Sequence, residues 1–486
     1  MKSINHQLII YTVAAFICCN YGAFSQVGIG TMSPDASSAL DINSTIGGIL
    51  TPRMTTAQRM AISNPANGLL VFDISENAFY FYKATLWTKM DAVVRDNYKL
   101  IKSIADLSTE LTAGGGAKYL LSSNTLYEIN GTISLAHPIE LNNAYLVGKD
   151  ANEDKLVKSG GIMFTGTTGG TIKTLTLIAS GGTVFGLTGS TTQNIIFRDS
   201  IVANSASVGS VSGFGLVFFS VIQYSGNANG ITYTNITDLL LNNAAWSINN
   251  SGTYETFTGT FGLIKKQGGY SKIDGANIGI DVSSNPTVNI GVLTQTTFSG
   301  TSTQYVKRYT TGSYAGYNFT NAWTVNCPGI PVESDQVSTG NIYFNGPITF
   351  GFVQTVTNNN PFNLVGNSNT NTTTAVNLLR VASPQDNRIT YLGKKTRTFQ
   401  INAALSIRGN SGTGDYYAFF IRKNGNTTLT ETNSLMRINS NTDISSNSIS
   451  GTVELAPNEY IEIWGQRLTG SGTTSITVFS LNLNIK

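Results

Sequence analysis

Short apolar runs recur along the middle of the chain, between about residue 120 and residue 299. They are rich in β-branched and aromatic residues, and Gly, Asn, Ser and Thr separate them. The clearest runs are residues 195–197, 216–218, 236–241, 261–264 and 278–280. They follow one another roughly every 20 residues, a spacing typical of stacked repeats that bury their apolar sides against each other. The pattern therefore predicts a right-handed parallel β-helix, a β-solenoid, over residues 117–330.

The pattern changes after residues 331–339, which are predicted to be a linker. Residues 340–486 contain longer runs in which apolar and polar residues alternate, as in strands with one buried face. The clearest are residues 399–407, 416–423, 452–455, 460–466 and 474–485. About eight such strands predict an antiparallel jelly-roll sandwich at the C-terminus. The expected fold class is all-β, with a small N-terminal module and a short helix before the solenoid.

Residues 26–92 are predicted to form the small N-terminal module. A short capped helix is expected at residues 55–60, and residues 69–73 and 78–82 are expected to form a hairpin. The runs that characterise the module are residues 27–31, 39–42, 48–59 and 67–73. In these runs the stretch resembles an N-terminal module common in exported surface proteins and phage-tail-fibre-like proteins. The resemblance implies attachment or display.

Residues 93–116 are predicted to contain a helix that ends at three consecutive glycines. Its apolar positions step by four and three, as in a heptad repeat. The positions are Val93, Asn97, Leu100, Ile104, Leu107 and Leu111. Because the stretch is shorter than three heptads, we favour a helix that caps the open end of the solenoid. A coiled-coil neck is the alternative.

The beginning of the chain is typical of an export signal. Lys2 precedes an apolar run at residues 8–19, and a small-x-small site follows at residues 23–25. We therefore expect residues 1–25 to be a signal peptide and the protein to be secreted or held at the cell surface. Cys18 follows the bulky Ile17, which is unfavourable for lipid attachment, and no later segment is apolar and long enough for a transmembrane helix.

The composition narrows the chemistry that the mature chain can perform. Charged residues make up 12% of the sequence and the net charge is +3, with the basic residues dispersed, so a nucleic-acid partner is not expected. Without residues 1–25 the chain keeps one cysteine, Cys327, and one histidine, His137. One histidine cannot by itself provide a zinc site or a Ser-His-Asp triad. We expect no metal and no cofactor.

Parallel β-helices also occur in pectate-lyase-like and polysaccharide-hydrolysing families, which the predicted fold resembles, and such enzymes depend on clustered acids. Hydrolases need a pair of carboxylates, and lyases need a calcium site and a base. Aligning the apolar runs places Asp199 opposite Ser220 and leaves Asp238 without an acidic counterpart. The remaining acids are Glu255, Asp274 and Asp281, of which the last two are weak catalytic candidates. Lys265 and Lys266 are predicted to lie at a solvated corner.

Aromatic residues offer a stronger prediction for binding, because sugars stack on flat rings. Phe197 and Phe218 are predicted to be interior and in register. Four other aromatics near Asn- and Gly-rich turns are expected to be exposed and to contact a glycan. These predicted ligand-binding residues are Tyr224, Tyr233, Trp246 and Tyr254.

The runs at residues 417–425 and 453–464 resemble the terminal domain of trimeric C1q/TNF-like proteins and of phage-fibre tips. The resemblance implies a homotrimer with a tip that binds a receptor or glycan. Our first hypothesis is a non-catalytic surface or fibre protein that binds carbohydrate or a surface receptor. A secreted polysaccharide lyase or glycoside hydrolase and a phage-derived tail-spike component are the alternatives.

Overall fold

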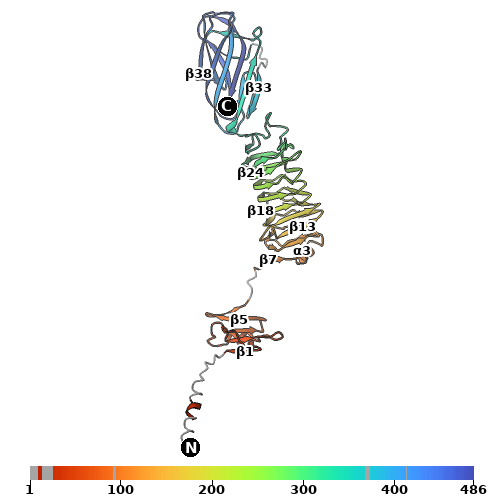
Figure 1. Cartoon of the computed structure of the whole chain (residues 1–486). Helices are drawn as coiled ribbons and strands as arrows, with labels where there is room; N and C mark the ends of the chain where they lie inside the picture. Colours follow the sequence, from red (N-terminus) through yellow and green to blue (C-terminus); the bar gives the residue numbers. More distant parts are fainter. Residues whose placement is uncertain (1–8, 14–25, 91–94, 367–372, 412) are drawn as a thin grey trace. The chain divides into compact units, whose positions relative to one another are not determined.

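The structure is a computed structural model that describes residues 9–13, 26–90, 95–366, 373–411 and 413–486 (Figure 1). The chain divides into two compact units, Met1–Arg95 and Asp96–Lys486. Most of the predicted signal peptide lies outside the described residues, and residues 9–13 within it are helical. Among the described helices, none combines the length and the apolar character needed to cross a bilayer.

The N-terminal unit confirms the predicted helix and hairpin. Its elements are β1 (Val27–Ile29), β2 (Leu40–Ile42), β3 (Arg53–Met54), α2 (Thr56–Met60), β4 (Leu70–Asp73), β5 (Ala78–Lys83) and β6 (Leu86–Lys89). Thr55 caps α2 in a capping box with Gln58. Asp73 is buried beneath α2, where burial alone would raise its pKa. Hydrogen bonds from Arg59, from Thr56 and from two backbone N–H groups instead lower this pKa to about 2.

The second unit begins with the predicted β-solenoid, whose strands form parallel sheets around one core (Figure 1). We call its three walls face 1, face 2 and face 3. Face 1 contains β7 (Tyr98–Ile101), β9 (Leu126–Ile129), β12 (Tyr145–Val147), β15 (Gly170–Lys173), β26 (Thr287–Thr294), β29 (Trp323–Asn326) and the first parts of β18 (Asn194–Ala203), β20 (Leu216–Ser225), β22 (Asp238–Trp246) and β24 (Thr260–Lys272).

The four long strands bend and continue into face 2. Face 2 also contains β10 (Thr132–Ser134), β13 (Lys155–Ser159), β16 (Thr176–Ser180) and β27 (Thr297–Ser299). Face 3 contains β8 (Tyr119–Leu120), β11 (Ile139–Glu140), β14 (Ile162–Gly166), β17 (Thr183–Thr188), β19 (Ser207–Ser212), β21 (Ile231–Thr234), β23 (Thr253–Thr258), β25 (Ile278–Asp281) and β28 (Val306–Lys307). Inward residues from all three faces form one continuous apolar core.

The register of the coils differs from the predicted one by one residue. Phe197 pairs with Phe219, and their ring centroids lie 5.3 Å apart inside the core. Phe218 therefore points outward, so its predicted interior position is wrong. Ser220 pairs with Arg198 rather than with Asp199. Because side chains alternate between the two sides of a strand, a shift of one residue exchanges inside and outside.

The predicted helix over residues 93–111 is wrong in its first half. Residues 91–94, which include Val93, lie outside the described residues, and Tyr98–Ile101 is strand β7, paired with β9. The strand forms because it pairs with β9 and satisfies backbone groups that the first coil would otherwise leave unpaired at the edge of its sheet. A short helical segment does follow, as η1 (Ile104–Leu107) and α3 (Ser108–Ala113). Its buried Glu110 accepts hydrogen bonds from Lys99 and Tyr127 of the first coils.

The C-terminal part is an antiparallel sandwich of two six-stranded sheets, richer in strands than predicted. One sheet contains β30 (Thr339–Asn345), β31 (Phe352–Thr357), β33 (Thr374–Leu379), β36 (Arg397–Gly409), β39 (Ser445–Leu455) and β41 (Thr473–Ile485). The other contains β32 (Pro361–Asn363), β34 (Val381–Ala382), β35 (Arg388–Tyr391), β37 (Tyr416–Lys423), β38 (Thr427–Arg437) and β40 (Tyr460–Arg467). The two sheets enclose a core of their own.

The segment predicted as a linker, residues 331–339, is packed rather than free. Glu333 is buried and accepts hydrogen bonds from the backbone N–H groups of Asn318 and Phe319 in the solenoid. Asp335 begins η2 (Asp335–Val337) and is bound by Arg380 of the sandwich. The segment connects the solenoid to the sandwich, as predicted by its position, and its polar residues bind neighbouring groups of both.

Candidate functional site

A row of bend residues separates face 1 from face 2 in the central coils. They adopt the left-handed backbone region, with φ between 48° and 71°. The row consists of Thr174, Asp199, Val221, Asn243, Gly268 and Gln295. Asparagine and glycine tolerate this conformation, whereas a β-branched residue is strained in it. Val221 is therefore strained, and 51% of its surface is exposed.

A second outward row runs along face 2, two residues beyond the bends. It consists of Ile201, Gln223, Ala245 and Tyr270, each paired with the next in parallel register. Neighbouring strands lie about 4.8 Å apart, so successive members of the row are close neighbours. The row ends with an aromatic ring one coil beyond Ala245.

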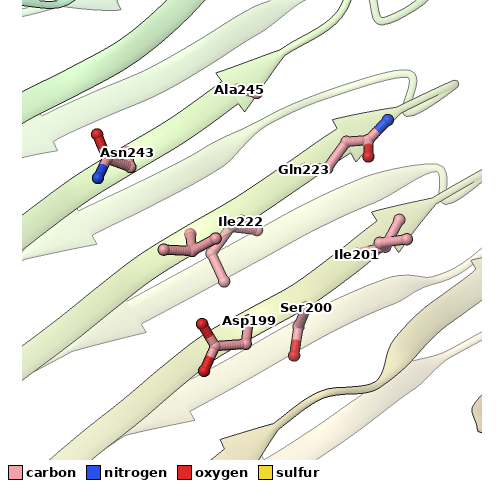
Figure 2. Close-up of a pocket in the computed structure, with 8 residues that line it drawn as sticks. Asp199, Ser200, Ile201, Ile222, Gln223, Asn243 and Ala245 are labelled. Atoms are coloured by element: carbon pink, nitrogen blue, oxygen red, sulfur yellow. The ribbon is translucent and has the colours of Figure 1, made fainter. Parts of the chain in front are cut away.

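A shallow groove of about 370 Å³ lies between the bend row and the face 2 row (Figure 2). In Figure 2, Asp199 and Asn243 lie on one side of the groove, and Ile201 and Gln223 lie on the other. Polar groups come from Asp199, Ser200, Gln223 and Asn243, and apolar surface comes from Ile201, Val221, Ile222 and Ala245. The groove thus joins an apolar floor to a few hydrogen-bonding groups.

The polar groups of the groove differ in how far they are already occupied. Within the described residues, the side-chain amides of Gln223 and Asn243 have no hydrogen-bond partner, so their donors and acceptors are open to a ligand. Asp199 accepts a hydrogen bond of 2.8 Å from Nε of Arg198. The Ser200 hydroxyl donates to the backbone carbonyl of Arg198 at 2.7 Å. The groove can therefore bind hydroxyl groups through two free amides and one carboxylate.

Tyr270 supplies an exposed aromatic ring next to the groove. Its surface is 44% exposed, and its partner in the register is Ala245 of the groove. Two glycines precede it, Gly268 and Gly269, and a Cβ on either would lie about 2 Å from atoms of the preceding coil. Sequence reasoning overlooked this tyrosine. Its outward position follows from the bend at Gly268, after which the alternation places Ser271 inward and Tyr270 outward.

The four aromatics predicted to bind a ligand are buried, so the prediction that they are exposed is wrong. Tyr224, Tyr233, Trp246 and Tyr254 are at most 1% exposed. The rings of Trp246 and Tyr254 stack at 4.4 Å inside the core. The reason is that β20 and β22 continue past their bends, which places Tyr224 and Trp246 on inward positions of face 2. They fill the core and are closed to a ligand on the outer wall.

Asp274 and Asp281, the weak catalytic candidates, each bind residues of the following coil, and Asp281 also binds its own turn. Asp274 accepts hydrogen bonds from the backbone N–H and the hydroxyl of Thr301. Asp281 accepts from Ser283, and Lys307 lies 3.2 Å from its carboxylate. Burial would raise the pKa of Asp281, but these partners lower it below its usual range. The hydrogen bonds give both acids structural roles, and nothing pairs the two with each other.

Glu255, the third acid considered, forms a buried ion pair with Lys266. The Lys266 Nζ atom lies 3.0 Å from Glu255 Oε1, and both side chains are at most 2% exposed. Burial raises the pKa of Glu255, and the opposing charge of Lys266 limits the rise. The predicted solvated corner is therefore correct only for Lys265, which is exposed. The pair lies in the core, where Lys266 Nζ is 4.9 Å from the ring centroid of the buried Tyr254.

The other reactive residues are separated from the groove. Cys327 is buried, and burial raises the pKa of its thiol. His137 packs against the ring of Tyr119 near the first coils. In the described part of the chain, three or more His, Cys, Asp or Glu side chains are nowhere grouped as a metal site requires.

Residues 28–106 match the protein family described as a phage tail like trimerisation region. The match covers the N-terminal unit and continues into β7 and η1 of the solenoid. No curated protein matches the chain. Among solved structures, the PRD1 vertex protein P5 is 10% identical, covers 30% of this chain and 94% of that chain, and has a TM-score of 0.19. Eiger TNF from S. frugiperda is 12% identical, covers 31% and 92%, and has a TM-score of 0.20.

Neither structural similarity carries an argument at these TM-scores. The family match concerns the N-terminal region, which precedes a stacked β-solenoid and an antiparallel sandwich.

Proposed function

We propose that this chain is an exported, fibre-like binding protein that assembles as a homotrimer and binds glycan chains in the groove between face 1 and face 2. The observation that carries the proposal is the composition of the groove. Unpaired amides of Gln223 and Asn243 flank an apolar floor that leads to the exposed ring of Tyr270. Sugars present both hydroxyl groups and apolar C–H faces, and this site offers a partner for each.

The trimer is supported by the family match over residues 28–106. Export is supported by the basic start, apolar run and small-residue site of residues 1–25. Together they support a protein displayed at the cell surface or released from it. Three copies would present three grooves, and simultaneous binding of one polysaccharide or one cell surface would strengthen weak individual contacts.

The chemistry of the groove supports binding without catalysis. A glycoside hydrolase of the usual kind places two carboxyl groups on either side of the bond that it cleaves. Of the eight residues that line this groove, all within the described chain, Asp199 alone has a carboxylate. That carboxylate is bound by Arg198. A lyase or hydrolase acting on the solenoid wall is the alternative that the same experiment tests.

The test is binding of the purified protein to a panel of bacterial and host polysaccharides, with each hit titrated by calorimetry. Gln223→Ala and Tyr270→Ala should each weaken binding about five- to tenfold, the effect of losing about 1 kcal/mol. Tyr416→Ala is the matched control. Tyr416 is also 44% exposed, but it lies on the sandwich, and its removal should leave the affinity unchanged.

Two outcomes would contradict the proposal. If Tyr416→Ala abolishes binding while Tyr270→Ala does not, the sandwich binds the ligand and the groove does not. If bound polysaccharide is cleaved, seen as new reducing ends or unsaturated uronates, the protein is an enzyme. Asp199→Asn then shows whether the groove performs the reaction, because it should remove turnover and preserve binding.

A further inference from the structure

One outward row of face 1 is apolar over seven consecutive coils. We call it the face 1 stripe: Tyr98, Leu126, Tyr145, Thr171, Ile196, Phe218 and Leu240, paired in parallel register from β7 to β22. Thr171 is the one member of the stripe that is neither aliphatic nor aromatic. A sheet that faces water on one side normally alternates apolar residues inward with polar residues outward. The stripe breaks that rule for the same row in coil after coil.

The stripe is clearly outside the core. Ile195 and Phe197, which flank Ile196 in β18, are fully buried, whereas Ile196 is partly exposed and Tyr145 is 46% exposed. No stripe residue belongs to the buried core cluster. With strands about 4.8 Å apart, the stripe is roughly 29 Å long.

In the coils from β15 to β22, the outward row two residues further along the same strands is polar and provides an internal comparison. It consists of Lys173, Arg198, Ser220 and Asn242. In the earlier coils the same row is mixed, because Leu100 and Val147 are apolar and Glu128 of β9 accepts a hydrogen bond from Tyr98 of the stripe at 3.1 Å. An apolar strip beside a polar rim is the usual anatomy of a protein–protein interface. Beyond Leu240 the next position is the exposed Lys265, which ends the stripe.

We propose that the face 1 stripe is the surface along which the solenoids of three copies of this chain pack against one another. The inference rests on the proposed trimer and adds the residues that form its contact along the solenoid. The partner that packs on the stripe is another copy of this chain, because the stripe begins at Tyr98, inside the residues that match a trimerisation region. Copies held together there by residues 28–106 start the solenoid side by side.

The geometry of the stripe fits this partner. A threefold axis parallel to a stack of coils brings the same residue of each copy to the same height. Only uncharged residues can meet their own copies at such an axis without repulsion, and the stripe is uncharged along its whole length. At Lys265 like charges would meet, and there the stripe stops. A glycan would instead require hydrogen-bonding groups, which the stripe offers only at Thr171 and the two tyrosines.

The first test is chemical cross-linking by a short bis-maleimide of the full chain in which Cys18 and Cys19 are replaced by Ser. Ile196→Cys should give covalently linked dimers on a denaturing gel, because two of the three thiols meet at the axis. Ser210→Cys, exposed on face 3, is the control that should remain monomeric on the gel. The same chain without either added cysteine is the background control, because Cys327 is buried.

The second test perturbs the contact and compares two neighbours on the same side of β22. Leu240→Asp should raise the concentration at which the trimer dissociates by 100-fold or more, because each trimer then carries three clustered carboxylates. Asn242→Asp, in the polar row, should change it less than threefold. Circular dichroism of both variants checks that the solenoid is folded, and Leu240 points outward, so the core is unchanged.

Light scattering on the unsubstituted chain tests the proposed trimer separately from the proposed contact along the stripe. A monomer overturns the proposed trimer and with it this inference. A trimer in which Ile196→Cys fails to cross-link, or in which Leu240→Asp and Asn242→Asp dissociate alike, leaves the proposed assembly intact and refutes the stripe as its contact.

Discussion

Removing the amine of the buried ion pair should destabilise the solenoid strongly. In Lys266→Met the carboxylate of Glu255 loses the partner that lies 3.0 Å away, in a position at most 2% exposed. At an effective dielectric constant of about 20, two charges at that distance attract by roughly 5–6 kcal/mol. Breaking one side of a buried pair typically costs about 3–5 kcal/mol, because the remaining charge stays buried without a partner. We expect a loss of that size in the free energy of unfolding.

The same reasoning makes a double substitution less harmful than the single one. Glu255→Leu combined with Lys266→Met removes both charges and fills the space with apolar atoms. Replacing a buried pair in this way is often neutral or stabilising by about 1–4 kcal/mol. The double variant should therefore be at least about 3 kcal/mol more stable than Lys266→Met alone.

The destabilisation should also depend on pH. Burial raises the pKa of Glu255 in the folded chain, and losing Lys266 raises it further. A carboxyl group whose folded pKa is raised stabilises fully below its unfolded pKa of about 4.3 and loses this contribution as the pH rises through the folded pKa. Lys266→Met should be close to the unsubstituted protein near pH 4 and least stable at pH 8.

Urea unfolding followed by the fluorescence of Trp246, with Trp87, Trp323 and Trp464 replaced by Phe in every variant, measures these effects locally. Its ring stacks at 4.4 Å on Tyr254, next to Glu255, so its emission reports on the coils that contain the pair. Sandwich and solenoid have separate cores, and a probe inside the affected coils avoids averaging over both. A double variant as unstable as Lys266→Met, or a loss that does not change between pH 4 and pH 8, would refute the reasoning.

Three further predictions concern single positions. Val221→Asn should raise the thermal stability of the solenoid by about 1 kcal/mol, because it relieves a strained left-handed residue, as Asn243 does one coil later; an unchanged melting temperature contradicts it. Tyr309→Phe should cost about 1–3 kcal/mol in urea unfolding, because the buried Trp323 Nε1 then loses its acceptor. Asp73 should stabilise the N-terminal unit above pH 4, and this stabilisation should be lost as the pH falls through the Asp73 pKa of about 2. Hydrogen exchange of β4 measures this pH dependence, and Asp73→Asn should abolish it.

The local pattern of the sequence was sufficient for the elements that depend on neighbours in the chain. The capped helix at α2 and the hairpin of β4 and β5 follow from residues within a few positions of each other. The recurrence of β-rich runs was sufficient for the solenoid, because each run must bury its apolar side against the next. The change to longer alternating strands predicted the C-terminal sandwich for the same reason.

The register between coils was decided only in the tertiary structure. The paired positions 197, 219, 241, 266 and 293 step by 22, 22, 25 and 27 residues, so no single period aligns them. This alignment is fixed by hydrogen bonds between strands one coil apart and by the row of bends. Neither feature can be identified from residues that are close together in the sequence. A one-residue difference then turns a side chain from core to surface.

That register explains which site predictions were wrong. It buries Tyr224 and Trp246, which the sequence places near turns, and it exposes Tyr270 beside the groove. It also separates Asp199 from Ser220. The sequence by itself thus determined that the chain stacks into coils with an apolar interior. Only the folded structure decided which residues line the groove and the face 1 stripe, because an outer surface of a solenoid is assembled from residues one whole coil apart.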